Sequence, residues 1–185
     1  MKLLSPRAWL PVLALAAAGT IGLAQIERLT LDQMVQKTDD GVTGVITKAK
    51  VFRVDHVTDG SELFFTTLTV RGKSLTDGTL KTIDVTYPGG FISPEEGVWN
   101  SEAPSADDTR IGNDVVVFYK WLDNIGGDVA ANRLYASHGG LFRVAKSRKG
   151  KVVLGRGVGY AIPSNIELDE LDSTITQIAE QVKKQ

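Results

Sequence analysis

Residues 41–54 read GVTGVITKAKVFRV, and this stretch decides the fold class because its β-branched residues alternate with polar ones. Residues 62–71 read ELFFTTLTVR, a mixture of aromatic residues and threonine that also favours a strand. The turn-forming residues between them are Thr58, Asp59, Gly60 and Ser61. The sequence therefore predicts two neighbouring strands joined by a turn.

Further strands are predicted toward the C-terminus. In residues 80–87, Ile83, Val85 and Tyr87 share one face and polar residues share the other, which is the period of a half-buried strand. Residues 115–122, VVVFYKWL, form a continuous apolar run that is typical of a buried strand, and residues 134–144 and 151–154 supply two more. Because the strands do not alternate with helices, we expect a mainly β protein, a small antiparallel OB-like barrel over residues 41–163.

A helix is predicted on each side of this barrel. In residues 25–40, Thr30 followed by Gln33 matches a capping box at the start of a short amphipathic helix. In residues 164–185, apolar side chains recur at helical spacing from position 168, with acidic residues first and lysines last, as the helix dipole favours. The C-terminal helix is therefore expected to be longer and also amphipathic.

The first segment has the pattern of a secretory signal peptide. Residues 1–24 place Lys2 and Arg7 before a short apolar run and end in small residues. An uncleaved membrane anchor is the alternative, but the run is short for the ~20 residues of a spanning helix. We expect cleavage before Gln25, no transmembrane segment afterwards, and a periplasmic or extracellular protein of a bacterial envelope or secretome.

The composition excludes several classes of protein. The 185 residues suit one domain, and the absence of cysteine excludes disulfides, cysteine-based zinc sites and a thiol nucleophile. The net charge is -1, and removing Lys2 and Arg7 leaves 19 basic against 22 acidic residues, a net charge of -3. Such a balance argues against a nucleic-acid partner.

Five short motifs extend over residues 41–144, namely GVI at 44–46, TTLTV at 66–70, YPGG at 87–90, IGND leading into VVVF at 111–118, and GLFRV at 140–144. Together they resemble the netrin and tissue-inhibitor-of-metalloproteinase type of OB-fold barrel, and the resemblance implies that fold. The inhibitors of that family chelate a protease metal through an N-terminal cysteine, which this chain lacks, so that mechanism does not carry over.

The motifs of common catalytic sites are not completed. Ser137 and His138 are adjacent, so on a strand they would point to opposite faces and could not act as nucleophile and base. The glycine run at 155–159 leads into an extended segment and not into a helix, so it predicts turns and not a phosphate-binding loop. No cofactor is expected.

The connection from Pro88 to Asn113 is long for an unstructured loop, and such loops are usually functional or disordered. Its apolar residues, Phe91 and Trp99 among them, predict an ordered loop over the barrel with Trp99 partly buried. The loop also carries carboxylates that are weak candidates for calcium ligands, solvation being the alternative; they are Glu102, Asp107 and Asp108.

A second candidate loop runs from Asp123 to Arg133. Aromatic residues beside the two loops could form a platform for a sugar or a peptide, or could simply cover the barrel. The predicted contact surface consists of Phe91, Trp99, Arg110, Trp121, Asp128 and Arg133.

From these features we expect an exported, non-catalytic binding module with a protein or glycan partner. One alternative is a protein that binds or inhibits an extracellular protease, which the resemblance alone suggests. An alternative from another class is a hydrolase that uses a carboxylate pair, Glu95 or Glu102 with Asp108.

Overall fold

The computed structural model describes residues 27–55 and 60–184. The predicted signal peptide and residues 58 and 59 of the predicted turn lie outside these ranges. The elements, in chain order, are α1 (Leu31–Lys37), β1 (Asp40–Val54), β2 (Leu63–Ser74), β3 (Leu80–Pro88), β4 (Gly90–Ser93), β5 (Glu96–Val98), β6 (Asp114–Leu122), β7 (Ala131–Leu134), the 3₁₀ helix η1 (Ser137–Gly140), β8 (Leu141–Lys146), β9 (Lys151–Val153), β10 (Ile166–Glu167) and α2 (Leu168–Val182).

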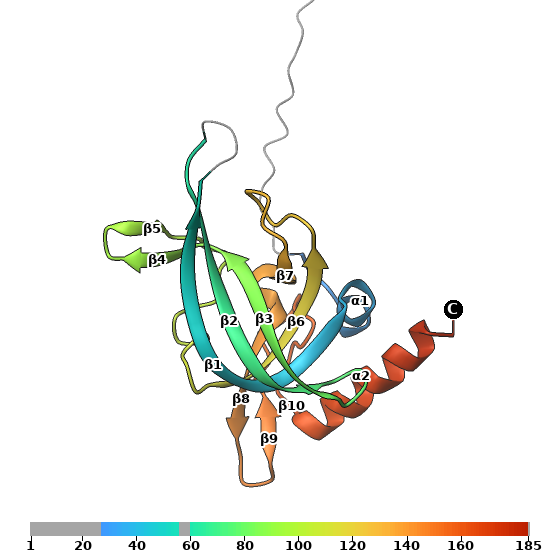
Figure 1. The fold of residues 1–185 in the computed structure, drawn as a ribbon. Coiled ribbons are helices and arrows are strands. Elements are labelled where there is room, and N and C mark those ends of the chain that lie inside the picture. The colour runs from blue at the N-terminus through green and yellow to red at the C-terminus, as the bar shows by residue number, and fades with distance from the viewer. Residues whose placement is uncertain (1–26, 56–59, 185) are drawn as a thin grey trace, which may run out of the picture.

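Five strands close into a barrel in the order β1-β2-β3-β7-β6, and β6 pairs back onto β1 (Figure 1). The predicted fold class, a mainly β barrel with a short N-terminal and a longer C-terminal helix, is confirmed. One pairing differs from the expected antiparallel arrangement, because β3 and β7 run parallel at Thr86 and Arg133. The result is a closed mixed barrel that is compatible with an OB-like fold.

Strand β1 pairs with both β2 and β6, because it bends where two glycines face each other. Gly44 is paired with Gly72 of β2, and a Cβ atom at position 72 would lie 1.9 Å from the carbonyl oxygen of Thr43. A register shift between Ile46 and Lys48 adds a bulge just beyond the bend. The first half of β1 can therefore pair with β6 while the whole strand pairs with β2.

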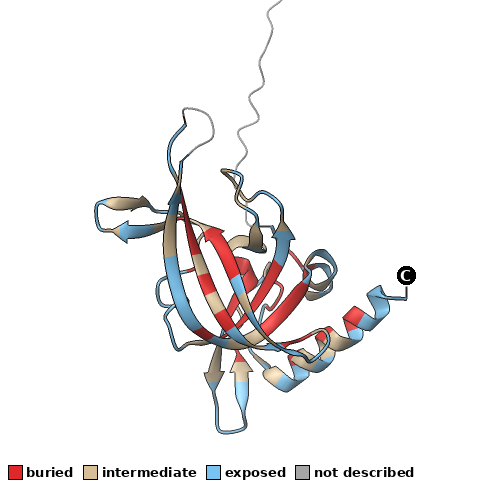
Figure 2. Cartoon of the chain, in the orientation of Figure 1, coloured by how far each residue is buried: buried red, intermediate tan, exposed pale blue. Residues whose placement is uncertain are grey.

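The barrel wall separates two apolar clusters (Figure 2). Alternate residues of β6 supply both, since Val115, Val117 and Tyr119 face the interior while Val116 and Phe118 face outward. The outward cluster is covered by the two helices and the C-terminal segment. Its other fully buried members include Met34, Leu75, Phe142, Val153, Leu171 and Ile175.

Both helices form where the sequence predicts them. The Thr30–Gln33 capping box is present, with the Thr30 side chain accepting from the Gln33 backbone and the Gln33 side chain accepting from the Thr30 backbone. Helix α2 buries Leu171 and Ile175 against the barrel, and its Asp172 pairs with Lys73 of β2 at 3.0 Å.

The predicted strand at 134–144 is interrupted, which corrects the sequence interpretation. Ala136 and Ser137 adopt left-handed conformations with φ of 52° and 54°, so the chain makes the turn η1 between β7 and β8. Gly140 permits this turn, because a Cβ there would lie 1.9 Å from the carbonyl oxygen of Tyr135. Among the described residues, no helix is both long enough and apolar enough to cross a membrane.

Candidate functional site

The long connection between β3 and β6 contains a hairpin, β4–β5, that projects from one end of the barrel (Figure 1). Its base is fixed to the barrel by hydrogen bonds on both sides. The Thr66 hydroxyl donates to the Gly89 carbonyl at 2.6 Å, the Gly89 amide donates to Phe64 at 2.7 Å, and the Asn100 side chain donates to Pro88 at 3.0 Å. The hairpin is therefore an extension of the barrel wall with a defined position.

This hairpin exposes large apolar side chains. Trp99 has 75% of its surface exposed, so the expectation that it would be partly buried is wrong. Phe91, Ile92 and Val98 are each about half exposed. Phe91 lies across the hairpin from Gly97, and a Cβ atom at position 97 would come within 2.6 Å of the Phe91 ring. Large apolar side chains exposed together on one projection indicate a candidate interaction surface.

A cavity of about 300 Å³ lies at the foot of the hairpin. Trp99 and Val98 form one side, and Phe64, Pro88 and Gly89 at the ends of β2 and β3 form the other. Arg53 pairs beside it with Glu96 of the hairpin at 3.0 Å and with Glu62 at 3.3 Å. The cavity is thus apolar along the side that Trp99 and Val98 line, and Glu62 and its partner Arg53 place charge at its border.

The second candidate loop reaches the same end of the barrel (Figure 1). Gly126 and Gly127 lie against Phe65, Leu63 and Val54, at the ends of β1 and β2. The loop is ordered from within, since the Asn124 amide donates to Asp128 at 3.1 Å and the Gly126 amide donates to Asn124 at 2.7 Å. Leu63, which also lines the cavity, connects the two loops.

The other predicted contact residues are dispersed. Trp121 is half exposed, and its indole donates to Asp123 at 3.0 Å. Arg133 is exposed on β7 opposite Lys120, and Arg110 pairs with Asp107 at 2.7 Å. Trp99 and the 123–130 loop therefore lie at the same end of the barrel. The contacts of Arg110 do not connect it to Trp99 or to this loop.

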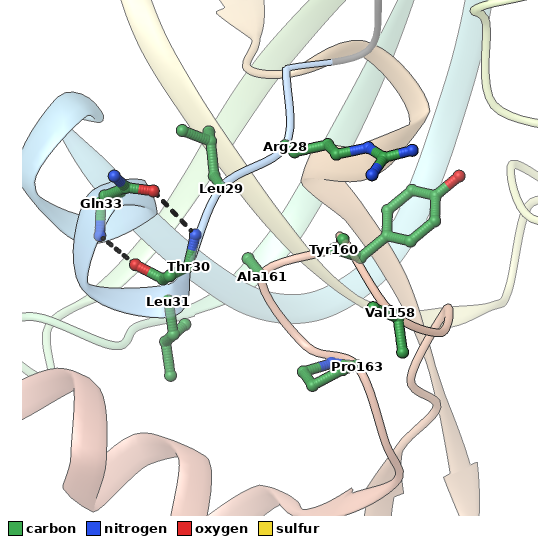
Figure 3. Close-up of a pocket in the computed structure, with 10 residues that line it drawn as sticks. Arg28, Leu29, Thr30, Leu31, Gln33, Val158, Tyr160, Ala161 and Pro163 are labelled. Carbon is green, nitrogen blue, oxygen red and sulfur yellow. Dashed lines mark hydrogen bonds between the residues drawn. The ribbon is translucent and has the colours of Figure 1, made fainter.

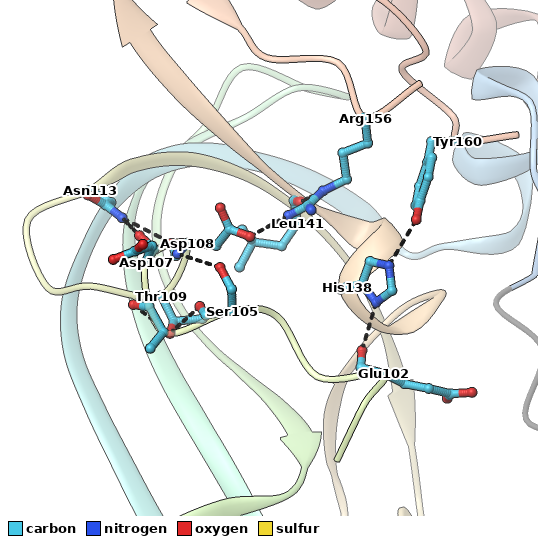
Figure 4. A network of polar contacts seen from close by, with 11 residues as sticks. Glu102, Ser105, Asp107, Asp108, Thr109, Asn113, His138, Leu141, Arg156 and Tyr160 are labelled. Carbon is cyan, nitrogen blue, oxygen red and sulfur yellow. Dashed lines mark hydrogen bonds and ion pairs between the residues drawn. The ribbon is translucent and has the colours of Figure 1, made fainter. Parts of the chain in front are cut away.

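The three calcium candidates each have a different partner, and Figure 4 shows the pairing of Asp108 with Arg156. Asp107 pairs with Arg110, Asp108 pairs with Arg156 at 2.9 Å, and Glu102 accepts from the Ser137 hydroxyl at 3.2 Å. Within residues 27–55 and 60–184, no group of three or more acidic or histidine side chains could hold a metal ion. Glu95, proposed for a hydrolytic pair, accepts from Ser93 on the exposed β4–β5 turn.

His138 joins three segments of the chain (Figure 4). Its Nδ1 lies 3.1 Å from the Glu102 carbonyl oxygen, which can only accept, so Nδ1 carries the proton. The other ring nitrogen, Nε2, is hydrogen-bonded to the Tyr160 hydroxyl at 3.0 Å. Ser137 and His138 lie on a 3₁₀ turn, which corrects the expected strand, and Ser137 bonds to Glu102 instead of to the imidazole.

Replacing His138 with alanine is expected to lower the free energy of unfolding by about 1–3 kcal/mol, because two partly buried partners lose their bonds. Tyr160→Phe removes only one of these bonds and should cost about 0.5–1.5 kcal/mol. Urea unfolding of both variants provides the measurement. If His138→Ala were as stable as the unmodified protein, the hydrogen bonds of His138 would contribute nothing to the free energy of unfolding.

A second, larger groove of about 550 Å³ lies beside α1 (Figure 3). Leu29 and Leu31 form one wall, and Tyr160, Ala161 and Pro163 form the other. Sequence reasoning missed it because its walls come from segments about 130 positions apart that carry no motif. The glycine run at 155–159, predicted to form turns, supplies its Val158 and Gly159 border.

An ion pair between the buried Asp40 and the partly exposed Lys81 closes the end of the barrel next to α1, and the sequence analysis did not predict it. Asp40 is 4% exposed and binds Lys81 at 2.5 Å, while its other oxygen accepts from Ser74 at 3.0 Å and Thr76 at 2.8 Å. Burial alone would lower the pKa of Lys81, but its bond to Asp40 and the charge of Asp40 raise it overall. Burial, and then the Asp40 charge, raise the pKa of the neighbouring Tyr119.

Comparison of the chain with protein families, with curated proteins and with solved structures finds no match.

Proposed function

We propose that the protein is an exported, non-catalytic binding module that holds a protein partner through the β4–β5 hairpin and the cavity beneath Trp99. The observation that carries this proposal is the exposure of Trp99, Phe91, Ile92 and Val98 on a hairpin whose base is hydrogen-bonded to the barrel. A rigid apolar projection of this kind does not have to be ordered when it binds, which favours affinity. Tryptophan is also prominent among the residues that dominate binding energy at interfaces.

The chemistry of the hairpin favours a protein over a glycan. Phe91 and Val98 are cross-strand partners of Gly97 and Gly90, adjacent positions whose side chains point to opposite faces. The hairpin is therefore apolar on both faces, and Ile92 adds aliphatic surface. A sugar site instead combines a flat aromatic ring with many polar groups, whereas an apolar projection suits a recess in a protein.

Trp99→Ala should weaken partner binding by roughly 30-fold or more, which corresponds to the about 2 kcal/mol of a typical hot-spot residue. The chain beginning at Gln25 would be immobilised, partners from envelope and culture medium identified, and the affinity of the purified partner measured. Leu80→Ala is the matched control, since Leu80 is 87% exposed on β3 and away from the hairpin.

Two outcomes would contradict the proposal. A partner that binds the Trp99→Ala and Leu80→Ala variants equally well uses another surface. Capture of glycans alone, lost on replacement of Trp99, would keep the site but change the class of partner. Circular dichroism of each variant would confirm that the barrel remains folded.

A further inference from the structure

The hairpin β8–β9 projects from the body of the barrel at the bottom of Figure 1, on a different side from β4–β5. Its turn is tight, with the Ser147 amide donating to the Gly150 carbonyl at 2.7 Å and the Lys149 amide donating to the Ser147 hydroxyl at 3.2 Å. Gly150 has a φ of 146°, which glycine adopts easily. Arg148 and Lys149 therefore occupy the tip of a short, well-formed projection.

This tip carries a concentration of positive charge. Lys146, Arg148, Lys149 and Lys151 are all exposed. Lys151 pairs with Asp114 at 3.0 Å, and the ion pairs found within the described residues include neither Arg148 nor Lys149. The four basic residues of the tip thus offer at least two charges that no neighbouring carboxylate neutralises.

The charge asymmetry extends well beyond the turn. Residues 129–166 contain seven basic residues and no acidic residue, although the whole chain has a net charge of -1. Acidic residues begin at the base of the hairpin, because Glu167 of β10 pairs with Val152 of β9 and is followed by Asp169, Glu170 and Asp172 at the start of α2. The positive charge is therefore concentrated at the tip, beyond the acidic residues at the base of the hairpin, and the tip presents it to a negatively charged surface.

We propose that the β8–β9 tip docks the protein on an anionic membrane surface by binding lipid phosphate groups. The shape of the tip favours this partner over a soluble polyanion, because an extended polymer is usually held along a groove whereas a projection presents its charges to a plane. The contact is electrostatic, since the turn itself has no large apolar side chain to insert. It uses neither Trp99 nor the cavity beneath it.

The test measures sedimentation of the chain beginning at Gln25, which keeps every described element, with vesicles. Vesicles of equal parts phosphatidylcholine and phosphatidylglycerol should bind it, and phosphatidylcholine alone should not. Each basic residue near such a surface contributes about a fivefold factor, so Arg148→Gln with Lys149→Gln should lower partitioning by roughly 30-fold. Binding should also weaken as salt is raised, since exposed charges are screened.

The matched control is Lys183→Gln with Lys184→Gln, which changes the net charge equally at exposed positions after α2. Partitioning should fall much less than for the tip variant. An equal fall in the two double variants would overturn the proposal, because binding would then follow net charge alone. Sodium phosphate that displaces the protein from vesicles better than sodium chloride of the same ionic strength would also overturn it, in favour of a site for free phosphate.

Discussion

Replacing Gly72 with alanine should destabilise the protein by about 3–5 kcal/mol, which is in the range of severe single substitutions. The new Cβ would lie 1.9 Å from the Thr43 carbonyl oxygen and 2.5 Å from the Gly44 Cα. Both are backbone atoms, so no side-chain rotation can relieve the contact. The strands would have to separate at the bend where β1 pairs with both β2 and β6, and barrel closure depends on that bend.

Gly112→Ala is the control for this prediction. Gly112 has a φ of 93°, but a Cβ there would meet nothing within 4 Å. Its replacement should therefore cost about 1–2 kcal/mol from backbone strain alone. Urea unfolding monitored by tryptophan fluorescence distinguishes the two, and a Gly72→Ala protein as stable as Gly112→Ala would show that the close approach of β1 and β2 is not needed.

Lys81→Ala should lower the free energy of unfolding by about 2–4 kcal/mol, because it leaves the Asp40 carboxylate buried without its cation. Ser74 and Thr76 would still donate to that carboxylate, which keeps the loss below the largest values seen for buried charges. A double variant, Asp40→Asn with Lys81→Met, removes both charges and should recover at least half of the loss. If the double variant is less stable than Lys81→Ala, the pairing of charges is not the cause.

The pH dependence of stability provides a second readout for the same pair. The pKa of Lys81 is raised in the folded protein, so its contribution is fully present below the ordinary lysine pKa of about 10.4. The contribution is lost as the pH rises through the higher folded value. Thermal unfolding of the unmodified protein should therefore show a loss of stability at strongly alkaline pH that is smaller in the double variant, where the burial that raises the pKa of Tyr119 still contributes to the loss.

The sequence was sufficient for most of the elements, because their signals are local. Alternation in residues 41–54 and the Thr30–Gln33 capping box depend only on neighbouring residues, and both predictions are confirmed. The continuous apolar run at 115–122 also gave the buried strand β6. The run did not reveal that the two faces of β6 belong to different apolar clusters, one inside the barrel and one under the helices.

The errors arose where distant contacts decide the conformation. The turn requires left-handed conformations at Ala136 and Ser137, and the sequence Leu-Tyr-Ala-Ser contains no glycine or asparagine that would predict them. His138 is hydrogen-bonded to the Glu102 carbonyl, which lies 36 positions earlier in the chain. Trp99 was expected to be partly buried because tryptophan usually is, but the hairpin carries it outward. The site residues remain predictions, since only their positions are known.

The pairing of β1 with β6 also determines when the protein can fold. Asp40 pairs with Tyr119, 79 positions later, and Lys73 bonds to Asp172 across 99 positions. Contacts between such distant segments form slowly, because a long loop must close before they contribute any stability. During synthesis, which proceeds from the N-terminus, the sheet therefore stays open until β6 has been made. Its apolar outer face stays uncovered until α2 has been made. Throughout that interval the chain depends on remaining unfolded, or on a chaperone, to avoid aggregation.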